Sequence, residues 1–145
     1  EYYILNVIYT QEPMEITEPA VAEMLTKDNV GNANIESNNG GRGFTRNVIT
    51  NLRNLGNRHT NVRWFHQGEN KVARILSNST GVMNNIYFPI NWEDRWPEFS
   101  KHLKHYVRTG KNEHDDAEDC LTGVYENPKP KNTNMTMTNK SFINM

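Results

Sequence analysis

Residues 2–10 carry the first clear hydrophobic pattern of the chain, a run of aromatic and β-branched side chains that favours a β-strand. Apolar residues occupy both faces of this strand: one face carries Tyr3, Leu5, Val7 and Tyr9, and the other carries Ile4 and Ile8. A strand that is apolar on both faces is typical of a covered sheet. Because the given sequence also begins within this strand pattern, we expect neighbouring strands upstream of it.

Helical and strand patterns alternate after this segment. Apolar residues three or four positions apart indicate helices, and short β-branched or aromatic runs indicate strands. The expected helices are 17–30 (with Thr17 as N-cap and Pro19 in the first turn), 44–55, 70–76, 96–106 and 115–124, and the expected strands are 32–36, 62–66 and 86–90. This alternation predicts an α/β layer fold.

Length and composition narrow the class of protein. The 145 residues suit one domain, expected over 1–126, whereas residues 127–145 are polar, have no hydrophobic periodicity and are expected to be a disordered tail.

The formal net charge of −1 means that any DNA contact must use a local basic patch. No apolar run approaches the roughly 20 residues of a membrane span. The single Cys120, expected in the core, excludes an internal disulfide and fits a reducing compartment.

The strongest candidate for chemistry is the run His114-Asp115-Asp116-Ala117-Glu118-Asp119. Asp119 lies three residues after Asp116 and four after Asp115, so it can share a helix face with either of them. Acids in the first turn of a helix also complement its dipole and cap free N–H groups. This structural role is the alternative to metal binding.

A second candidate is Glu36, at the end of the strand expected over 32–36 and followed by Ser37-Asn38-Asn39-Gly40-Gly41. α/β folds place their ligands at the C-terminal ends of strands, and glycines allow another backbone or a phosphate to approach closely. The alternative is an ordinary strand-to-helix loop with an exposed Glu. Together, the two acidic segments favour two-metal phosphodiester cleavage, in which carboxylates hold two hard cations roughly 4 Å apart.

The chain resembles the nuclease domain of the terminase large subunit, part of viral DNA-packaging motors, over about residues 2–125. The segments that carry the resemblance are Tyr2-Tyr3-Ile4-Leu5-Asn6-Val7, Glu36 with its Gly-Gly turn, Lys71-Val72-Ala73-Arg74-Ile75, and His114-Asp115-Asp116-Ala117-Glu118-Asp119-Cys120-Leu121. The resemblance implies a ribonuclease H-like mixed sheet flanked by helices. It also implies a Mg²⁺- or Mn²⁺-dependent endonuclease that cleaves concatemeric double-stranded viral DNA in the host cytoplasm.

The same resemblance implies partners and site residues. The partners are an ATPase domain in the same polypeptide, the portal and the small terminase subunit. Glu36 corresponds to the second catalytic acid and Asp116 to the third, with Asp115 or Asp119 as alternatives. Glu36, Asp116 and Asp119 are the expected metal ligands.

The chain departs from the family pattern at its start. The family's first catalytic Asp lies on the opening strand of the sheet, and here no strand precedes residues 2–10. No Walker-type ATPase motif is present either. We therefore expect the first strand or strands to be missing and little or no nuclease activity from these residues alone.

Several other side chains are candidates for supporting roles. Lys71 and Arg74, one helical turn apart, and Arg42 and Arg46, after the Gly-Gly turn, are expected to contact DNA phosphates, with solvated helix faces as the alternative. His114 is a candidate proton shuttle or outer-shell partner. Trp64 is expected in the core.

Two other functions stay open. Another ribonuclease H-like nuclease, such as a junction resolvase or a transposase core, would share the acidic arrangement. A non-catalytic module that docks on DNA or on the portal ring would fit the missing opening strand.

Overall fold

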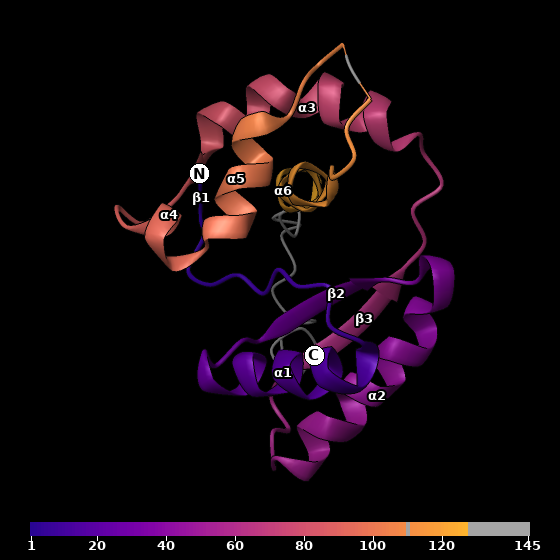
Figure 1. The fold of residues 1–145 in the computed structure, drawn as a ribbon. Helices are drawn as coiled ribbons and strands as arrows, with labels where there is room; N and C mark the ends of the chain where they lie inside the picture. Colours follow the sequence, from indigo (N-terminus) through magenta and orange to yellow (C-terminus); the bar gives the residue numbers. More distant parts are fainter. Residues whose placement is uncertain (110, 128–145) are drawn as a thin grey trace, which may run out of the picture. The chain divides into compact units, whose positions relative to one another are not determined.

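The computed structural model describes residues 1–109 and 111–127, which form two compact units (Figure 1). Unit 1 combines Glu1–Tyr9 with the described chain from Glu69 onward, and unit 2 is Thr10–Gly68. Each unit contains helices and one small sheet of two parallel strands. The mixed α/β class expected from the alternating pattern is therefore confirmed. The expected tail, residues 127–145, lies outside the described residues except for Asn127.

Unit 2 is a parallel strand pair packed against two helices. Its elements are α1 (Met14–Lys27), β2 (Asn32–Glu36), the 3₁₀ helix η1 (Asn38–Gly40), α2 (Gly41–Asn54) and β3 (Asn61–Phe65). The buried Ala22 and Leu25 of α1 and Val48 and Leu52 of α2 form its core. On β2, Ala33 and Ile35 pack against this core, whereas Asn32, Asn34 and Glu36 are exposed, because side chains alternate between the two faces of a strand.

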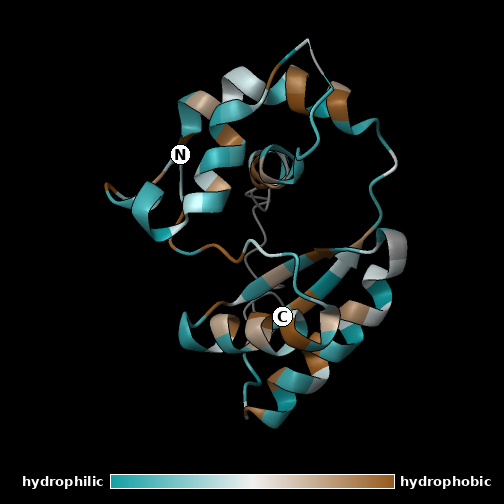
Figure 2. Cartoon of the chain, viewed as in Figure 1, coloured by the Kyte–Doolittle hydropathy of each residue, from teal (hydrophilic) through white to brown (hydrophobic). Residues whose placement is uncertain are grey.

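Unit 1 is built mainly from helices. Its elements are β1 (Tyr2–Tyr3), α3 (Lys71–Asn85), β4 (Ile86–Tyr87), α4 (Trp92–Arg95), α5 (Pro97–His105) and α6 (Asp116–Glu126). Ile86, Phe99, Ala117 and Leu121 are the buried core, and a stack of Phe88 on Trp92, with ring centroids 4.4 Å apart, extends it. Figure 2 shows hydrophilic and hydrophobic residues alternating along the helices of both units, as expected for helices that bury one side.

The sequence pattern predicted several elements closely. The strand expected over 32–36 is confirmed with the same bounds, and the strand expected over 62–66 is confirmed one residue earlier, as β3. The helix expected over 44–55 is confirmed as α2, and Gly56 follows it with φ +74°, the left-handed conformation that favours glycine after a helix.

The opening strand expected over 2–10 is wrong beyond Tyr3. Only Tyr2 and Tyr3 pair in register with Ile86 and Tyr87, and one further bond runs from Ile4 N to Tyr87 O. Of the remaining apolar side chains of this segment, Ile4, Val7 and Tyr9 pack against the core of unit 1, whereas Leu5 and Ile8 are exposed. The apolar pattern therefore reflects partial burial and not a continuous strand.

Three helix or strand boundaries also differ from expectation. α1 begins at Met14 rather than after Thr17, so Pro19 lies inside the helix instead of in its first turn. α3 continues to Asn85 instead of ending at residue 76, because the half-buried Val82 extends its packed side beyond the polar stretch 77–80. The strand expected over 86–90 is reduced to Ile86–Tyr87. No helix within the described residues is long and apolar enough to cross a membrane.

Gly81 makes the close contact between α3 and α6 possible. A Cβ at this position would lie 2.3 Å from the ring of Tyr125, which itself packs on the core and edge-on against Tyr2. We expect Gly81→Ala to lower the free energy of unfolding by about 1–3 kcal/mol, because the clash outweighs the gain of roughly 1 kcal/mol in helix propensity. Urea unfolding monitored by circular dichroism measures the change.

Gly123 in α6 provides the matched control. It lies in the same unit and also inside a helix, but a Cβ there would meet nothing within 4 Å. Gly123→Ala should therefore stabilise the chain by up to about 1 kcal/mol. Equal effects of the two substitutions would contradict the packing of Tyr125 on Gly81.

Candidate functional site

The acidic run opens helix α6, as the sequence predicted. Ala117 and Leu121 are buried in the core of unit 1 and orient the helix. Asp115 occupies the N-cap position, but its side chain makes no capping hydrogen bond. Asp115 therefore does not cap the helix, whereas the other part of the structural alternative holds: Asp116, Glu118 and Asp119 lie in the first turn, where acids complement the helix dipole.

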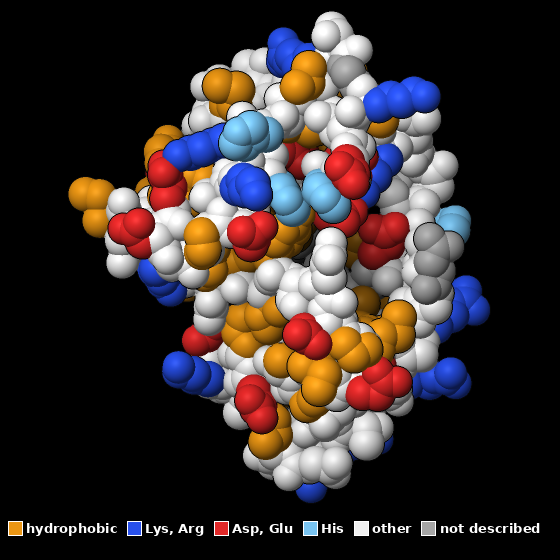
Figure 3. Space-filling view, in the orientation of Figure 1, with side chains coloured by type: hydrophobic (Ala, Val, Ile, Leu, Met, Phe, Trp, Pro, Cys, Tyr) orange, Lys and Arg blue, Asp and Glu red, His pale blue; other side chains and the backbone are white. Residues whose placement is uncertain are grey.

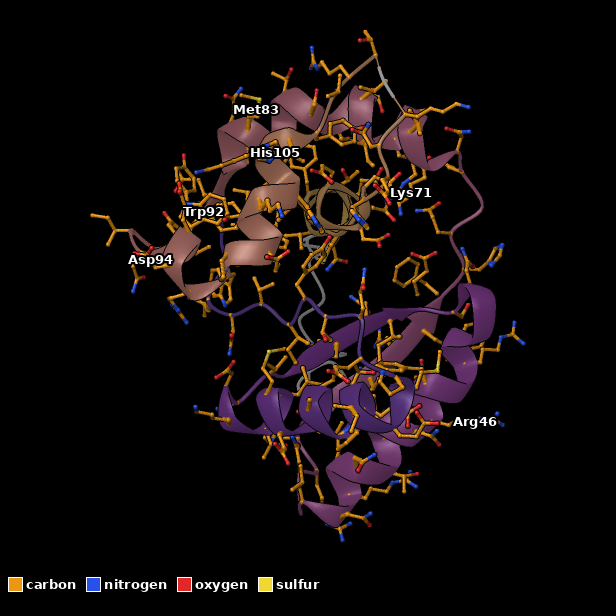
Figure 4. The ribbon with its side chains drawn as sticks, viewed as in Figure 1. Arg46, Lys71, Met83, Trp92, Asp94 and His105 are labelled. Carbon is orange, nitrogen blue, oxygen red and sulfur yellow. The ribbon has the colours of Figure 1, made fainter. Side chains whose placement is uncertain are left out.

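The acids of α6 converge on the side chain of Lys71, at the start of α3 (Figure 4). The Lys71 ammonium lies 2.7 Å from Asp115 Oδ1, 2.7 Å from Asp116 Oδ1 and 3.7 Å from Asp119 Oδ2. Burial by itself would lower the pKa of Lys71, but the hydrogen bonds and charges of Asp115 and Asp116 raise it well above its usual value. Lys71 is therefore a permanent positive centre for the acids at the start of the helix.

Arg74 continues the same interaction one helical turn further along α3. Its guanidinium donates to Asp119 at 2.8 Å and to Glu126 at 2.6 Å, and Asn78 also donates to Glu126 at 3.0 Å. Hydrogen bonding to Glu126 raises the pKa of Arg74 despite the lowering effect of burial. The side chain is only 6% exposed, so the solvated-face alternative is wrong for Arg74. Because the guanidinium is committed to α6, the structure argues against the phosphate contact expected of it.

Glu118 is a charged residue that the sequence analysis did not single out. It is 7% exposed, and neither carboxylate oxygen has a hydrogen-bond partner among the described residues. Burial raises the pKa of Glu118, and the charges of Asp115 and Asp116 add to the increase. The available signal was its position: Glu118 lies three residues before the core residue Leu121 and therefore on the buried side of α6.

A second group of polar aromatic side chains lies in unit 1. Tyr9 Oη lies 2.6 Å from His102 Nδ1, and the ring of His102 stacks on that of His114 with centroids 4.4 Å apart. Burial, followed by the charges of the α6 acids, raises the pKa of Tyr9. Figure 3 shows histidine side chains beside acidic ones on this unit. No sequence signal pairs residues 9 and 102, because only tertiary packing brings them together.

Glu36 ends strand β2 in unit 2, as predicted, and its side chain is exposed. Asn38 Nδ2 donates to Glu36 Oε1 at 2.6 Å and to the Gln67 carbonyl at 2.8 Å. The close approach expected of the glycines is confirmed: a Cβ on Gly41 would lie 2.0 Å from the Glu36 carbonyl oxygen, and Gly40 has φ +95°. The turn after Glu36 therefore requires glycine at both positions.

Arg42 and Arg46 lie on the first turns of α2, in unit 2, and both are exposed. The Arg42 guanidinium lies 4.4 Å from the ring centroid of Trp64. Trp64 is 52% exposed, so the prediction that it is a core residue is wrong: it lies near the end of β3, where Arg42 rather than the apolar core covers it. The core prediction for Cys120 is also wrong, because its side chain is exposed on α6.

The predicted site residues fall into both units. Lys71, Arg74 and the acids of α6 belong to unit 1, whereas Glu36, Arg42 and Arg46 belong to unit 2. The convergence of Glu36 with the α6 acids therefore stays a prediction. Within the described chain, no group of three or more His, Cys, Asp and Glu side chains is arranged to hold a metal ion. Comparisons with protein-family models, curated proteins and solved structures returned no match.

The raised pKa of Glu118 predicts a pH-dependent contribution to stability. Protonated Glu118 favours the folded state, so the contribution is full below the usual value of 4.5 and is lost as pH rises through the folded-state pKa. Glu118→Gln cannot ionise and should be more stable than the parent chain at about pH 7, on the order of 1 kcal/mol, with a smaller difference near pH 4. Thermal unfolding at both pH values measures this. Glu113→Gln, which changes an exposed acid of the same unit, should show no such trend; the same trend in both variants would contradict the burial of an unpaired carboxyl.

Proposed function

We propose that the chain is part of the ribonuclease H-like nuclease domain of a viral terminase large subunit. In this proposal it acts on double-stranded DNA in the host cytoplasm, with Mg²⁺ or Mn²⁺ as cofactor. The ATPase domain, the portal and the small terminase subunit are its proposed partners. The ordered set of sequence segments that resembles this family is the first support.

The convergence of the α6 carboxylates supports the proposal most directly. Asp115, Asp116 and Asp119 each place an oxygen within 4 Å of the Lys71 ammonium, so the start of α6 already concentrates negative charge on one position. Carboxylate oxygens are the ligands that Mg²⁺ and Mn²⁺ prefer. The carboxylates are thus of the donor type that suits a divalent cation, although in the described residues they surround an ammonium and are not arranged as a metal site.

The proposed roles of the chain's own residues follow from this arrangement. Asp116 and Asp119 hold the cation with Glu36, and Asp115 is the alternative ligand. Bound divalent cations would supply an activated water and stabilise the leaving oxygen of the phosphodiester. Lys71, half-exposed and on a flexible stem, keeps the carboxylates together when no divalent cation is present.

A non-catalytic docking module is the second candidate. The observation that favours it is the same ammonium: Lys71 neutralises the acids that a metal site needs, and Arg74 engages Asp119 as well. In a docking module these ion pairs would only join α3 to α6. The two candidates therefore differ in whether a divalent cation can replace Lys71.

Removing the competing ammonium separates the two candidates. If the α6 acids are metal ligands, Lys71→Met should raise the affinity for Mn²⁺ at least about tenfold, because a nearby unit charge contributes more than 1.4 kcal/mol in a partly buried site. Isothermal titration calorimetry with Mn²⁺ measures this, and adding Asp116→Asn to the variant should reverse the gain. Lys101→Met, an exposed lysine on α5, is the control with the same charge change. No increase in Mn²⁺ affinity in a folded Lys71→Met chain would favour the docking module.

Glu36 provides the test of catalysis. Any Mn²⁺-dependent nicking of supercoiled plasmid by the chain should be lost in Glu36→Ala, because the proposal makes this carboxylate a metal ligand. Glu23→Ala, which removes an exposed acid of the same unit, should leave the nicking rate unchanged. Nicking that persists in Glu36→Ala would exclude Glu36 from the site.

A further inference from the structure

Unit 2 carries a row of cationic side chains that is separate from the acidic site. Arg42, Arg46, Ile49 and Arg53 follow one another on α2 at intervals of four, three and four residues, the spacing that aligns side chains along one face of a helix. Arg58 lies in the turn that follows the helix. We call Arg46, Arg53 and Arg58 the arginine row.

The arginine row is not neutralised. All three side chains are exposed, and none makes an ion pair with a residue that the structure describes. Figure 4 shows Arg46 extending away from the ribbon. α2 itself contains no acid; the acids of unit 2 lie on α1 or beside it, apart from Glu36 at the end of β2. Lys71 and Arg74 of unit 1, by contrast, are both paired with carboxylates.

A shallow groove of about 350 Å³ lies beside Arg53 and Arg58. Its lining is mixed: the two arginines and the polar Asn57, Thr60 and Asn61 accompany the apolar Ile49, Leu52 and Val62. The turn that carries Arg58 is held by the buried Asn57, whose Nδ2 donates to Thr26 Oγ1 at 3.0 Å and to Thr60 Oγ1 at 2.8 Å. Asn57 Oδ1 also accepts the backbone N–H groups of residues 59 and 60. The position of Arg58 beside the groove is therefore preorganised rather than formed on binding.

We propose that the arginine row binds the phosphate backbone of DNA, with the groove taking the adjoining sugar or base. This deepens the proposed function, on which it rests for the identity of the polymer. It also extends the DNA contact expected of Arg46 to Arg53 and Arg58, whereas Arg74, another residue expected to contact DNA, is buried in ion pairs.

Charge and geometry favour a polynucleotide over an acidic protein. The step from Arg46 to Arg53 spans roughly 10 Å along the helix, about the axial length of three nucleotides of one strand. Guanidinium groups bind phosphate oxygens through paired hydrogen bonds, which suits a regular series of phosphates. The exposed Trp64 with Arg42 beside it extends the surface with an aromatic ring of the kind that contacts bases.

The test compares two triple variants of the whole chain that lose the same charge. One changes Arg46, Arg53 and Arg58 to Gln, and the control changes the exposed Lys27, Lys101 and Lys111 to Gln. Fluorescence anisotropy with a labelled DNA duplex gives the dissociation constant over a range of NaCl concentrations. The arginine variant should lose at least about tenfold in affinity at low salt and reduce the slope of log K against log salt by about 2–3, near 0.9 for each phosphate contact. The control should keep its slope.

Equal losses in the two triple variants would overturn the proposal, since the effect would then be one of net charge. Unchanged binding in the arginine variant would overturn it as well. Binding of polyglutamate that needs the same arginines and that DNA does not displace would assign the surface to an acidic protein instead. If the triple variant does not fold, the single variant Arg46→Gln should still reduce the slope by about 0.9.

The outcome is separable from that of the proposed function. Mn²⁺ affinity of the Lys71→Met chain depends on the α6 acids and should be unchanged when the arginine row is also replaced. A chain that fails to bind Mn²⁺ but loses DNA affinity with the arginine row would retain this inference and reject the metal site. The opposite result would retain the metal site and reject the inference.

Discussion

The balance of charge between α3 and α6 is the interaction on which unit 1 depends. α6 begins with four acids in five residues, and packing that helix on the core brings their carboxylates together. The two cations on α3 do not contribute equally. Lys71 is partly exposed, and ion pairs of that kind contribute about 0–1 kcal/mol, whereas the buried Arg74 side chain bonds two partly buried carboxylates, so its loss should cost more. Arg74 is thus chiefly structural, whereas Lys71 is the cation that a metal ion would displace in the proposed function.

This difference between the ion pairs of Lys71 and Arg74 connects the stability of unit 1 to the proposed binding of a metal ion. A site that must accept a divalent cation needs carboxylates that are held close together before the cation arrives, and such carboxylates repel one another. The Lys71 ammonium offsets part of that repulsion, and in the proposed site it would compete with the cation. Glu118 makes no hydrogen bond in this cluster, since its oxygens have no partner among the described residues, and burial raises its pKa.

In unit 2, by contrast, Arg46, Arg53 and Arg58 make no ion pair with a described residue. Most of its acids lie on or beside α1, whereas Arg42, Arg46 and Arg53 lie on α2 and Arg58 lies in the turn that follows, although the two helices pack against each other. The small core of Ala22, Leu25, Val48 and Leu52 packs the two helices together. The exposed side chains of Arg46, Arg53 and Arg58 therefore form a local group of positive charges in a chain whose formal net charge is −1.

The sequence by itself determined the elements whose signals are local. β2, α2 and the acidic start of α6 follow from alternation, from three- and four-residue spacing and from the glycines at 40, 41 and 56. Only the tertiary structure decided which side chains become partners. Residues 4–9 have the composition of a strand, but a strand forms only where another backbone completes its hydrogen bonds, and here pairing stops at Ile4. Likewise Arg74 and Lys71 look alike in sequence, and only the packing of α3 on α6 buries one and leaves the other accessible, because burial depends on distant segments and not on the neighbouring residues.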